Sequence, residues 1–450
     1  MTISEDFSKW AKNLSTKDIS DKSKKTLNYL IKDICGIILS ARNENYVQSL
    51  VKAYKGSGKF ISLGHGSDFD ISSSAIIAGT AAHGEDFDDT FEGNPMHVGA
   101  CMIPAILAAA QRFNLNGDQI LKSLAVGTEL MCRLALVAPT AMHKQGFHPT
   151  AVCGTFGVAA GLSSVLNLTE KQMVSSLGIA GSFTSGIIEY LAEGSWTKRI
   201  HPGWSANSGI NSVLIAQTDF YGPRTVFEGD HGFFSAFAIK EVKRDYSKLT
   251  DSLGSRWEIE NLAFKPFACG TMAQPFVDCA IKLRDKIKDF KKIKSIKAKV
   301  GEGTVHRLWE PSKEKKKPST PYSAKFSVPY CVAVGFLRKD AGLKEFDDKS
   351  INDKEILDLA NKVEYEVDPN DEYPKNYTGT LTCITEEVEL TEHQPCFRGG
   401  RKQPLTENDI DKKFNANLDY SKINESEKNN VKDFIKNIFT KPNFSKILTK

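Results

Sequence analysis

The most concentrated group of titratable side chains in the sequence lies between residues 81 and 99. Five carboxylates and two histidines fall within fifteen residues, directly before a segment too apolar to form an exposed helix. Because an unpaired buried carboxylate is costly, such a group needs compensating partners. Three interpretations are open: a surface loop whose acids cap a helix over residues 98–113, a site for acid–base chemistry, or a metal site. The metal site would belong to a hydrolase or hydratase that uses His83, Asp86, Asp89 and His97.

A second cluster spans residues 144–157, where a glycine-containing turn leads into an apolar helix. Backbone amides at such a helix start can hold an anion. The sequence has neither the phosphate-loop motif nor the glycine motif of dinucleotide-binding folds, so it predicts neither a nucleoside triphosphate nor NAD as ligand. Taken alone, His148 in this cluster is more simply a hydrogen-bonded structural histidine than a catalyst.

Three further clusters carry cations or a phenol beside apolar segments. They are residues 194–203 with Lys198 and Arg199, residues 264–270 with Lys265, and residues 324–330 with Tyr330. Each is weak by itself, because a lysine in a loop is usually just solvated.

These clusters must be positioned mainly by helices. From residue 21 onward, apolar residues recur at spacings of three and four, which predicts an amphipathic helix. Later segments up to about residue 240 mix Ala, Gly and Ser with Leu, Ile and Val on several faces. Helices of this composition are buried on more than one side and approach each other closely, so this part predicts a many-helix body.

The composition changes after about residue 260. Residues 291–300 end in a period-two pattern typical of a strand with one wet face, and residues 377–390 carry the strongest strand signal of the chain. The lysine-rich residues 313–317 predict a solvated loop. A Thr cap and an acidic first turn near residue 406 predict a return to helix that continues to about residue 439.

The overall composition limits the class of protein. Of the 450 residues, 40% are hydrophobic and 25% are charged, which is typical of a folded globular chain of two or three domains. A net charge of +4 lacks the basic excess of nucleic-acid binding proteins. No apolar run reaches 18 residues and the first 25 residues are polar, which predicts a cytoplasmic protein without a membrane partner or a signal peptide. The nine scattered cysteines predict reduced core residues.

Taken together and in this order, the clusters resemble the MmgE/PrpD family, which includes 2-methylcitrate dehydratase, cis-aconitate decarboxylase and iminodisuccinate epimerase. The resemblance rests on five short motifs and spans nearly the whole chain. They are D-F-D-D-T at residues 86–90, G-F-H-P-T at residues 146–150, T-K-R-x-H-P-G at residues 197–203, K-P-F-x-C at residues 265–269 and F-S-V-P-Y at residues 326–330.

The resemblance implies a mainly α fold with an inserted α+β domain. A large helical domain would consist of residues 1–264 and 405–450, and a smaller lid domain would consist of residues 265–404. It also implies a homodimer without metal or organic cofactor, which acts on a small di- or tricarboxylate in a pocket between the two domains. The composition change near residue 260 and the return to helix near residue 405 point independently to the same division.

The family keeps its active-site groups at positions that correspond here to Asp86, Thr90, His97, His148, Lys198, Lys265 and Tyr330. Chemistry suggests a role for each. Lys198 and Lys265, together with Arg199, would bind substrate carboxylates, since an ammonium ~4 Å from a carboxylate is attracted by roughly 4 kcal/mol before desolvation.

Proton transfer next to a carboxylate needs an acid or a base, and imidazole suits neutral pH. His97 and His148 would take that role, and Asp86 would orient or support a histidine. Thr90 and Tyr330 would donate hydroxyl hydrogen bonds to substrate oxygens.

The sequence identifies the reaction type less specifically than it identifies the family. The segment Phe91–Ala100 reads F-E-G-N-P-M-H-V-G-A, a compact form that differs from the dehydratase and decarboxylase patterns and is closer to the epimerase-like branch. All three reactions share a proton transfer at carbon alpha or beta to a carboxylate. The sequence therefore predicts a lyase of the dehydratase or decarboxylase type, with an epimerase as the alternative. A metal-dependent hydrolase and a non-catalytic dimer that binds carboxylates remain as competing hypotheses.

Overall fold

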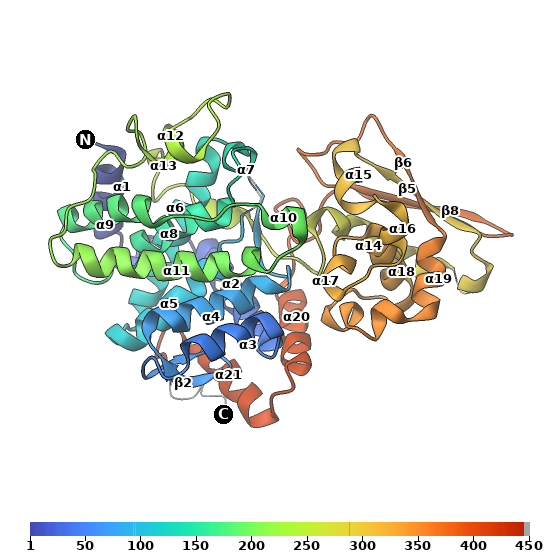
Figure 1. Cartoon of the computed structure of the whole chain (residues 1–450), viewed down its shortest axis with the longest axis horizontal. Helices are drawn as coiled ribbons and strands as arrows, with labels where there is room; N and C mark the ends of the chain where they lie inside the picture. The colour runs from blue at the N-terminus through green and yellow to red at the C-terminus, as the bar shows by residue number, and fades with distance from the viewer. Residues whose placement is uncertain (93, 95, 288, 445–450) are drawn as a thin grey trace. The chain divides into compact units, whose positions relative to one another are not determined.

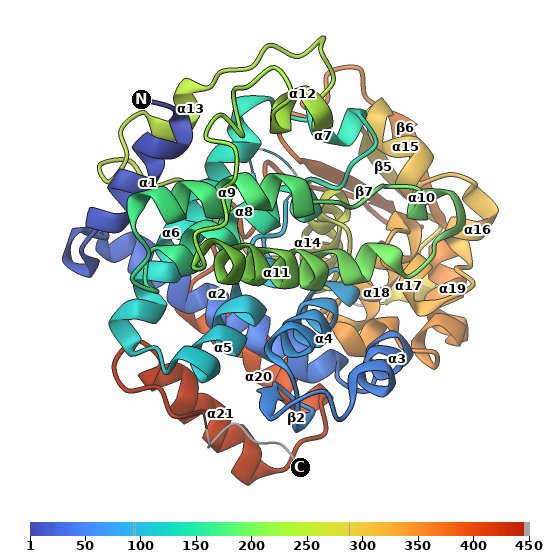
Figure 2. The ribbon, with the colours of Figure 1, turned by 60° about the vertical axis from the view of Figure 1, so that its left-hand side comes forward.

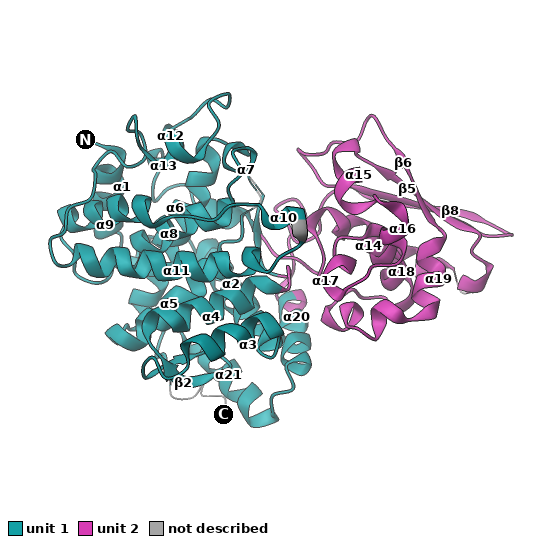
Figure 3. Ribbon diagram, viewed as in Figure 1, with its two compact units in different colours: residues 1–84, 88–262, 410–450 teal, residues 85–87, 263–409 magenta. Residues whose placement is uncertain are grey.

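A computed structural model gives the structure of the protein and describes residues 1–92, 94, 96–287 and 289–444. The chain forms two compact units (Figure 3). Unit 1 comprises residues 1–84, 88–262 and 410–450, and unit 2 comprises residues 85–87 and 263–409. Unit 1 is built from helices, whereas unit 2 combines helices with a four-stranded sheet. The predicted fold class, mainly α with a smaller α+β part, is confirmed.

Helices account for nearly all regular structure in unit 1. Its longer helices are α1 (Ile3–Asn13), α2 (Asp21–Ala41), α3 (Asn45–Tyr54), α4 (Ile71–Gly84), α5 (Gly99–Phe113), α6 (Gly117–Val137), α8 (Pro149–Ser163), α9 (Glu170–Phe183), α11 (Thr197–Ala216) and α21 (Glu425–Asn437). Short helices are α7 (Ala141–Lys144), α10 (Tyr190–Glu193), α12 (Phe233–Phe237) and α13 (Ser247–Thr250). A small hairpin pairs β1 (Phe60–Ser62) with β2 (Gly66–Phe69), and β3 (Thr90–Phe91) precedes α5.

The centre of unit 1 is α8, whose residues are all buried. Helix α11 packs against α4, α5, α8 and α9. Figures 1 and 2 both show α11 between α8 on one side and α4 and α5 on the other. The small, apolar residues of these segments permit this packing, because helices without bulky side chains can be covered on several faces.

The crossing of α4 and α11 depends on two glycines. A Cβ atom added to Gly79 would lie 2.5 Å from Cα of Gly203, and one added to Gly203 would lie 2.3 Å from the Ile76 carbonyl oxygen. Both glycines stand within one helical turn of a histidine, since His83 follows Gly79 by four residues and His201 precedes Gly203 by two. The close crossing therefore brings the histidine-bearing ends of two helices together.

The sheet of unit 2 has the strand order β6-β5-β7-β8. Its strands are β5 (Ser295–Val300), β6 (Val363–Val367), β7 (Gly379–Ile384) and β8 (Glu389–Gln394). β5 pairs in parallel with β6 and antiparallel with β7, and β7 pairs antiparallel with β8. Helices α14 (Gln274–Lys286) and α18 (Val328–Arg338) pack against these strands. Alternate residues of β5 are buried, as the predicted wet-faced strand requires.

Two details of unit 2 differ from the sequence predictions. The strand signal over residues 377–390 divides into β7 and β8, because Thr385 forms a turn with Val388. The lysine-rich segment predicted as a loop contains a short helix, α16 (Ser312–Lys316), in which the Lys315 ammonium donates to the carbonyl oxygens of Arg307 and Phe326. The other helices of unit 2 are α15 (Glu302–Leu308), α17 (Pro321–Ala324) and α19 (Lys354–Asn361).

The predicted return to helix is confirmed. Helix α20 (Glu407–Tyr420) follows Thr406, whose hydroxyl accepts from the Asp409 amide and whose own amide donates to the Asp409 carboxylate. In unit 1 the Lys413 ammonium pairs with buried Asp33 of α2 at 2.7 Å. This ion pair anchors α20 to the helical body.

All nine cysteines are buried and none of them forms a disulfide bond, as predicted for reduced core residues. Burial raises the pKa of the Cys153 thiol, which makes it a poor nucleophile. Among the helices of the described residues, none combines the length and the apolar character that a membrane crossing requires.

We expect Gly79→Ala to destabilise the protein by about 1–3 kcal/mol, because the new methyl group would overlap the backbone of Gly203. Urea denaturation measures the free energy of unfolding. Gly342→Ala serves as the control, since a Cβ atom there lies 3.4 Å from its nearest neighbour and should change stability by about 0.5 kcal/mol or less. Equal stability of the two variants would show that α4 and α11 do not need this close crossing.

Candidate active site

Four of the nine histidines gather in unit 1. His83 lies at the end of α4, His97 lies two residues before the start of α5, His148 is the N-cap residue of α8, and His201 lies in the second turn of α11. The ring centres of His83 and His97 are 4.7 Å apart, those of His83 and His148 are 5.5 Å apart, and those of His148 and His201 are 5.3 Å apart. The two predicted histidines, His97 and His148, therefore belong to a larger cluster.

The cluster lies where the N-termini of α5, α8 and α11 meet. The His97 amide donates to the Thr150 hydroxyl at 3.0 Å, which joins the starts of α5 and α8. The Ser205 hydroxyl of α11 donates to the Ala151 carbonyl oxygen at 2.7 Å, which joins α11 to α8. Because helix N-termini carry partial positive charge, their convergence favours an anionic ligand and disfavours extra protons on the imidazoles.

The carboxylate of Asp88 holds two of these histidines. It is fully buried and lies 2.7 Å from Nδ1 of His83 through Oδ2 and 3.4 Å from Nδ1 of His97 through Oδ1. Burial alone would raise the pKa of Asp88, but the neighbouring His97 and His83 outweigh it and hold the pKa well below its usual range. Asp88 is therefore ionised, which is the charge state that supports an imidazolium.

The hydrogen bonds of His97 fix which ring nitrogen can exchange protons. Its Nδ1 lies 2.7 Å from the backbone oxygen of Asp89. A carbonyl oxygen only accepts, so Nδ1 of His97 must carry a proton in the neutral and in the charged ring alike. Any proton that His97 takes or releases therefore moves at Nε2.

The hydrogen bonds of the Asp89 carboxyl group hold the start of α5, next to His97. Its two carboxyl oxygens accept from the amides of Val98 at 3.0 Å and Gly99 at 2.9 Å. Burial and the charges of Asp88 and Asp33 raise the pKa of Asp89. The interpretation that acids of this segment cap the following helix is thus correct for Asp89, although the carboxyl group is buried rather than on the surface.

The remaining histidines are held neutral. Burial lowers the pKa of His83 to about 4 against the opposing charge of Asp88. Burial and the charge of Lys198 lower the pKa of His201 to about 4, and burial together with the neighbouring histidines and Lys198 lowers the pKa of His148 well below its usual value. Neutral imidazoles beside helix N-termini can act as proton acceptors or donors without adding positive charge.

Lys198 is the cation of this cluster. Its charge lowers the pKa of His83, His148 and His201. The neighbouring Arg199 turns elsewhere, since its guanidinium lies over the ring of Tyr46 at 4.2 Å. Thr90 is buried in β3 and precedes the His97 segment. Gly93 and Pro95 of the compact sequence segment lie outside the described residues.

Asp86 and Lys265, which the resemblance places in the site, pair with each other in unit 2. The buried Lys265 ammonium donates to the Asp86 backbone oxygen at 2.7 Å and to its carboxylate at 3.1 Å. This pairing bears on two predicted roles. The carboxylate that supports histidines in unit 1 is Asp88, not Asp86, and a substrate carboxylate would have to share the Lys265 cation with Asp86.

Tyr330, which is predicted to donate to a substrate oxygen, has a hydrogen-bond partner of its own in unit 2. Its hydroxyl donates to the backbone oxygen of Glu345 at 2.7 Å, and burial raises the pKa of the phenol further. A phenol has one donor proton, so Tyr330 has none left for a substrate oxygen in this structure.

Three members of the cluster are not among the predicted catalytic residues: His83, Asp88 and His201. Each has a recognisable signal in the sequence. Asp88 stands two residues after Asp86 in D-F-D-D-T, and His201 follows Lys198 by three residues, which places both on one helix face. His83 ends an apolar helix, but only the metal hypothesis uses it.

The metal hypothesis predicts the wrong set of ligands. Asp86 pairs with Lys265, and Asp89 caps α5. Among the described residues, His83, Asp88 and His97 instead bring potential ligand atoms within 4.8 Å of one another. Nε2 of His83 is buried without a hydrogen-bond partner in the described structure. This trio could hold a divalent ion.

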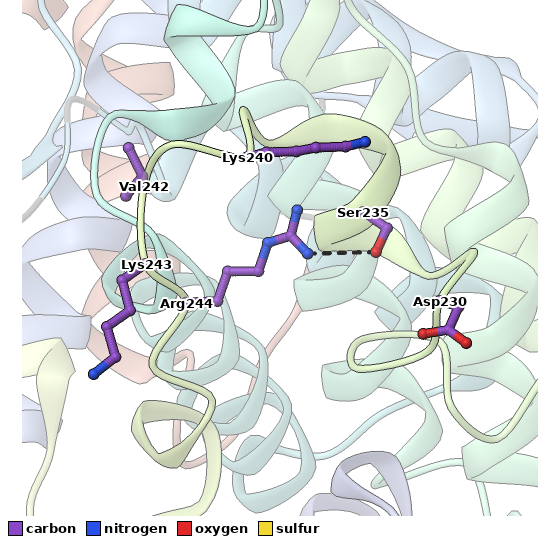
Figure 4. Close-up of a pocket in the computed structure, with 6 residues that line it drawn as sticks. All are labelled: Asp230, Ser235, Lys240, Val242, Lys243 and Arg244. Carbon is purple, nitrogen blue, oxygen red and sulfur yellow. Dashed lines mark hydrogen bonds between the residues drawn. The ribbon is translucent and has the colours of Figure 1, made fainter.

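A separate cavity of about 380 Å³ lies in unit 1 between α12 and the chain that follows it (Figure 4). Its lining residues are Asp230, Ser235, Lys240, Val242, Lys243 and Arg244, with Arg244 donating to the Ser235 hydroxyl at 3.4 Å. Three cations could attract an anion, but the lining offers no imidazole to exchange a proton at neutral pH. The histidine cluster is therefore the better candidate for chemistry.

Comparison with known proteins gives matches to two domain models and to several relatives. A model of the MmgE/PrpD N-terminal domain matches residues 5–245, and a model of the MmgE/PrpD C-terminal domain matches residues 267–437. A cis-aconitate decarboxylase of Homo sapiens is 27% identical over 364 residues, which cover 76% of this chain and 72% of the relative. A cis-aconitate decarboxylase of Aspergillus terreus is 24% identical over 384 residues, covering 80% and 77%.

A third relative, described as a cis-aconitate decarboxylase-like protein of Aspergillus oryzae, is 22% identical over 437 residues, which cover 92% of this chain and 89% of the relative. The similarity to all three thus extends over most of both chains.

We expect the buried histidines to make stability fall in acid. His201 is neutral in the native state with a pKa of about 4, whereas an unfolded histidine titrates near ~6.5. Between these values the unfolded chain binds more protons, so the free energy of unfolding falls as the pH drops from about 6.5 to about 4.

In His201→Asn this contribution is absent. The stability advantage of the wild type over the variant should shrink by roughly 2 kcal/mol between pH 7 and pH 5. Urea denaturation at both pH values measures it, and the His231→Asn variant, at an exposed position, is the control. A constant difference for His201→Asn would contradict the neutral state of this ring.

Proposed function

Because the chain belongs to the MmgE/PrpD family, we propose that it is a lyase that works without a cofactor on a small di- or tricarboxylate and moves a proton at a carbon next to a carboxylate. The observation that carries this proposal is the cluster of four histidines, two of which face ionised Asp88, with the proton of His97 exchanged at Nε2. The names of the relatives, all cis-aconitate decarboxylases or decarboxylase-like, favour a lyase over an epimerase.

Charge accounts for the substrate class. The starts of α5, α8 and α11 converge on the histidines, and Lys198 adds a full positive charge. A carboxylate bound there would be stabilised by the helix termini and by an ammonium hydrogen bond of about 1.5–3 kcal/mol. We assign substrate binding first to Lys198, with Thr90 as a hydroxyl donor and Arg199 as an outer cation.

The acid and base roles follow from the hydrogen bonds. His97 is the base in this proposal, because Asp88 lies 3.4 Å from its Nδ1 and would stabilise the imidazolium that forms when Nε2 takes a proton. Burial, the neighbouring histidines and Lys198 keep His148 neutral, so it is suited to give a proton back. Asp86 and Lys265 would act as a pair in unit 2, and Tyr330 as a packing residue.

The metal-dependent hydrolase is kept as a second candidate because His83, Asp88 and His97 group closely. Metal analysis of the purified protein separates the two. A stoichiometric divalent ion whose removal abolishes activity would favour the hydrolase, whereas full activity after chelation supports the proposed lyase. The homodimer stays a prediction that light scattering can check.

Incubation in D₂O with cis-aconitate, methylcitrate or iminodisuccinate tests the proposal. We expect one acid to acquire deuterium at the carbon next to a carboxylate, as followed by ¹H NMR. Loss of carbon dioxide would indicate a decarboxylase, loss of water a dehydratase, and exchange with unchanged composition an epimerase. If no C–H bond exchanges with any of the three acids, the protein is a binder of another kind and the proposal is wrong.

Two substitutions should separate proton transfer from binding. His97→Gln should lower kcat by about 10²- to 10⁴-fold, because it removes the base. Lys198→Met should raise KM by about 10- to 100-fold, because it removes a charged hydrogen-bond donor. Lys144→Met, at an exposed position of the same unit, is the matched control. Near-normal kinetics of both His97→Gln and Lys198→Met would show that His97 is not the base and that Lys198 does not bind the substrate.

A further inference from the structure

The contact between His148 and His201 has an unusual geometry. Their two Nδ1 atoms face each other at 3.1 Å, a hydrogen-bond distance. Two lone pairs or two N–H groups at this distance would repel, so one ring donates and the other accepts. If both rings are neutral, the pair therefore consists of one Nδ1–H tautomer and one Nε2–H tautomer.

This arrangement couples the protonation of the two Nε2 atoms, which lie on the far sides of the two rings. When His148 donates through Nδ1, its Nε2 carries a lone pair, and His201 carries its own proton at Nε2. When His201 donates, Nε2 of His148 carries the proton and Nε2 of His201 is free. The proton at Nε2 of His148 is thus controlled by the ring of His201, 5.3 Å away between centres.

The surroundings hold the pair in this geometry and keep it neutral. The His148 amide donates to the Gly186 oxygen at 2.9 Å, and a Cβ atom on Gly186 would lie 3.4 Å from Nδ1 of His201. The ring of Tyr190 lies 6.1 Å from His148 and 5.8 Å from His201. Burial and the charge of Lys198 disfavour a second proton on either ring.

His201 is also the more accessible ring of the pair. It is 9% exposed, whereas His148 is 3% exposed. Of the two rings, His201 therefore has the greater contact with solvent.

We propose that His201 is a positioning residue that relays protons between solvent and His148 through their facing Nδ1 atoms, so that His148 can serve as both acid and base. This inference rests on the proposed function. When Nε2 of His148 takes a proton, its Nδ1 proton passes to Nδ1 of His201, and Nε2 of His201 releases a proton to water. The reverse sequence delivers one proton from water to the substrate, and each ring ends neutral in both directions.

Asparagine at position 201 separates a relay from a simple hydrogen bond. Its amide can donate to or accept from Nδ1 of His148, but it cannot accept a proton on one side and release another on the far side. We expect His201→Asn and His201→Ala each to lower kcat by about 10- to 100-fold, within the range of general acid–base effects, with KM changed less than about twofold. The exposed His231→Asn is the control.

Chemical rescue supplies the second readout. The space left by His201→Ala matches an imidazole, so added imidazole should restore part of kcat in His201→Ala and none in His201→Asn, where the space is filled. Circular dichroism and urea denaturation establish that each variant is folded. Wild-type kcat in His201→Asn, or a folded His201→Ala that imidazole does not rescue, would overturn the relay.

A readout without activity keeps this test distinct from that of the proposed function. In ¹⁵N NMR spectra of histidine-labelled protein, with signals assigned from the His148→Asn and His201→Asn variants, the two rings should show opposite tautomers. The same tautomer in both rings, or a doubly protonated ring at neutral pH, would contradict the relay even if the enzyme is active. Opposite tautomers in a protein that is inactive on all three acids would support the His148–His201 hydrogen bond and would contradict the proposed function.

Discussion

A buried negative charge organises the helical unit. Asp88 has no exposed surface, and its carboxylate is tolerated there only because two imidazoles face it. His83 and His97 come from the end of α4 and the start of α5, so the carboxylate fixes the ends of two helices as well as two rings. The close crossing of α4 and α11 at Gly79 and Gly203 adds the third helix. The histidine cluster is thus a consequence of charge compensation in a tightly packed helical body.

The same constraint shapes the electrostatics of the site. Asp88 is the negative charge at the histidines, and Lys198 with the starts of α5, α8 and α11 supplies the positive side. The imidazoles lie between the negative charge of Asp88 and this positive charge. His83, His148 and His201 are held neutral by burial, whereas His97 has a carboxylate behind it and an exchangeable nitrogen in front. Such an arrangement suits proton transfer on an anion, because an imidazolium formed at His97 would have the Asp88 carboxylate as its compensating charge.

The sequence predicts the helical body and the main clusters well, because apolar periodicity and helix caps are local signals. It also places His97 and His148 among the candidate groups, and they do come together. It does not reveal which carboxylate meets which partner. Asp86 and Asp88 are two residues apart, yet one pairs with Lys265 in unit 2 and the other with histidines in unit 1. That choice depends on contacts between residues distant in the sequence, as does the hydrogen bond that commits the Tyr330 hydroxyl to Glu345.

Neutron diffraction on deuterated crystals tests the central claim most directly, because it locates the protons around the buried carboxylate. We predict deuterium on Nδ1 of both His83 and His97 and none on the Asp88 carboxylate. Deuterium on the Asp88 carboxyl group, or an Nδ1 of His97 without deuterium facing the Asp89 oxygen, would contradict it.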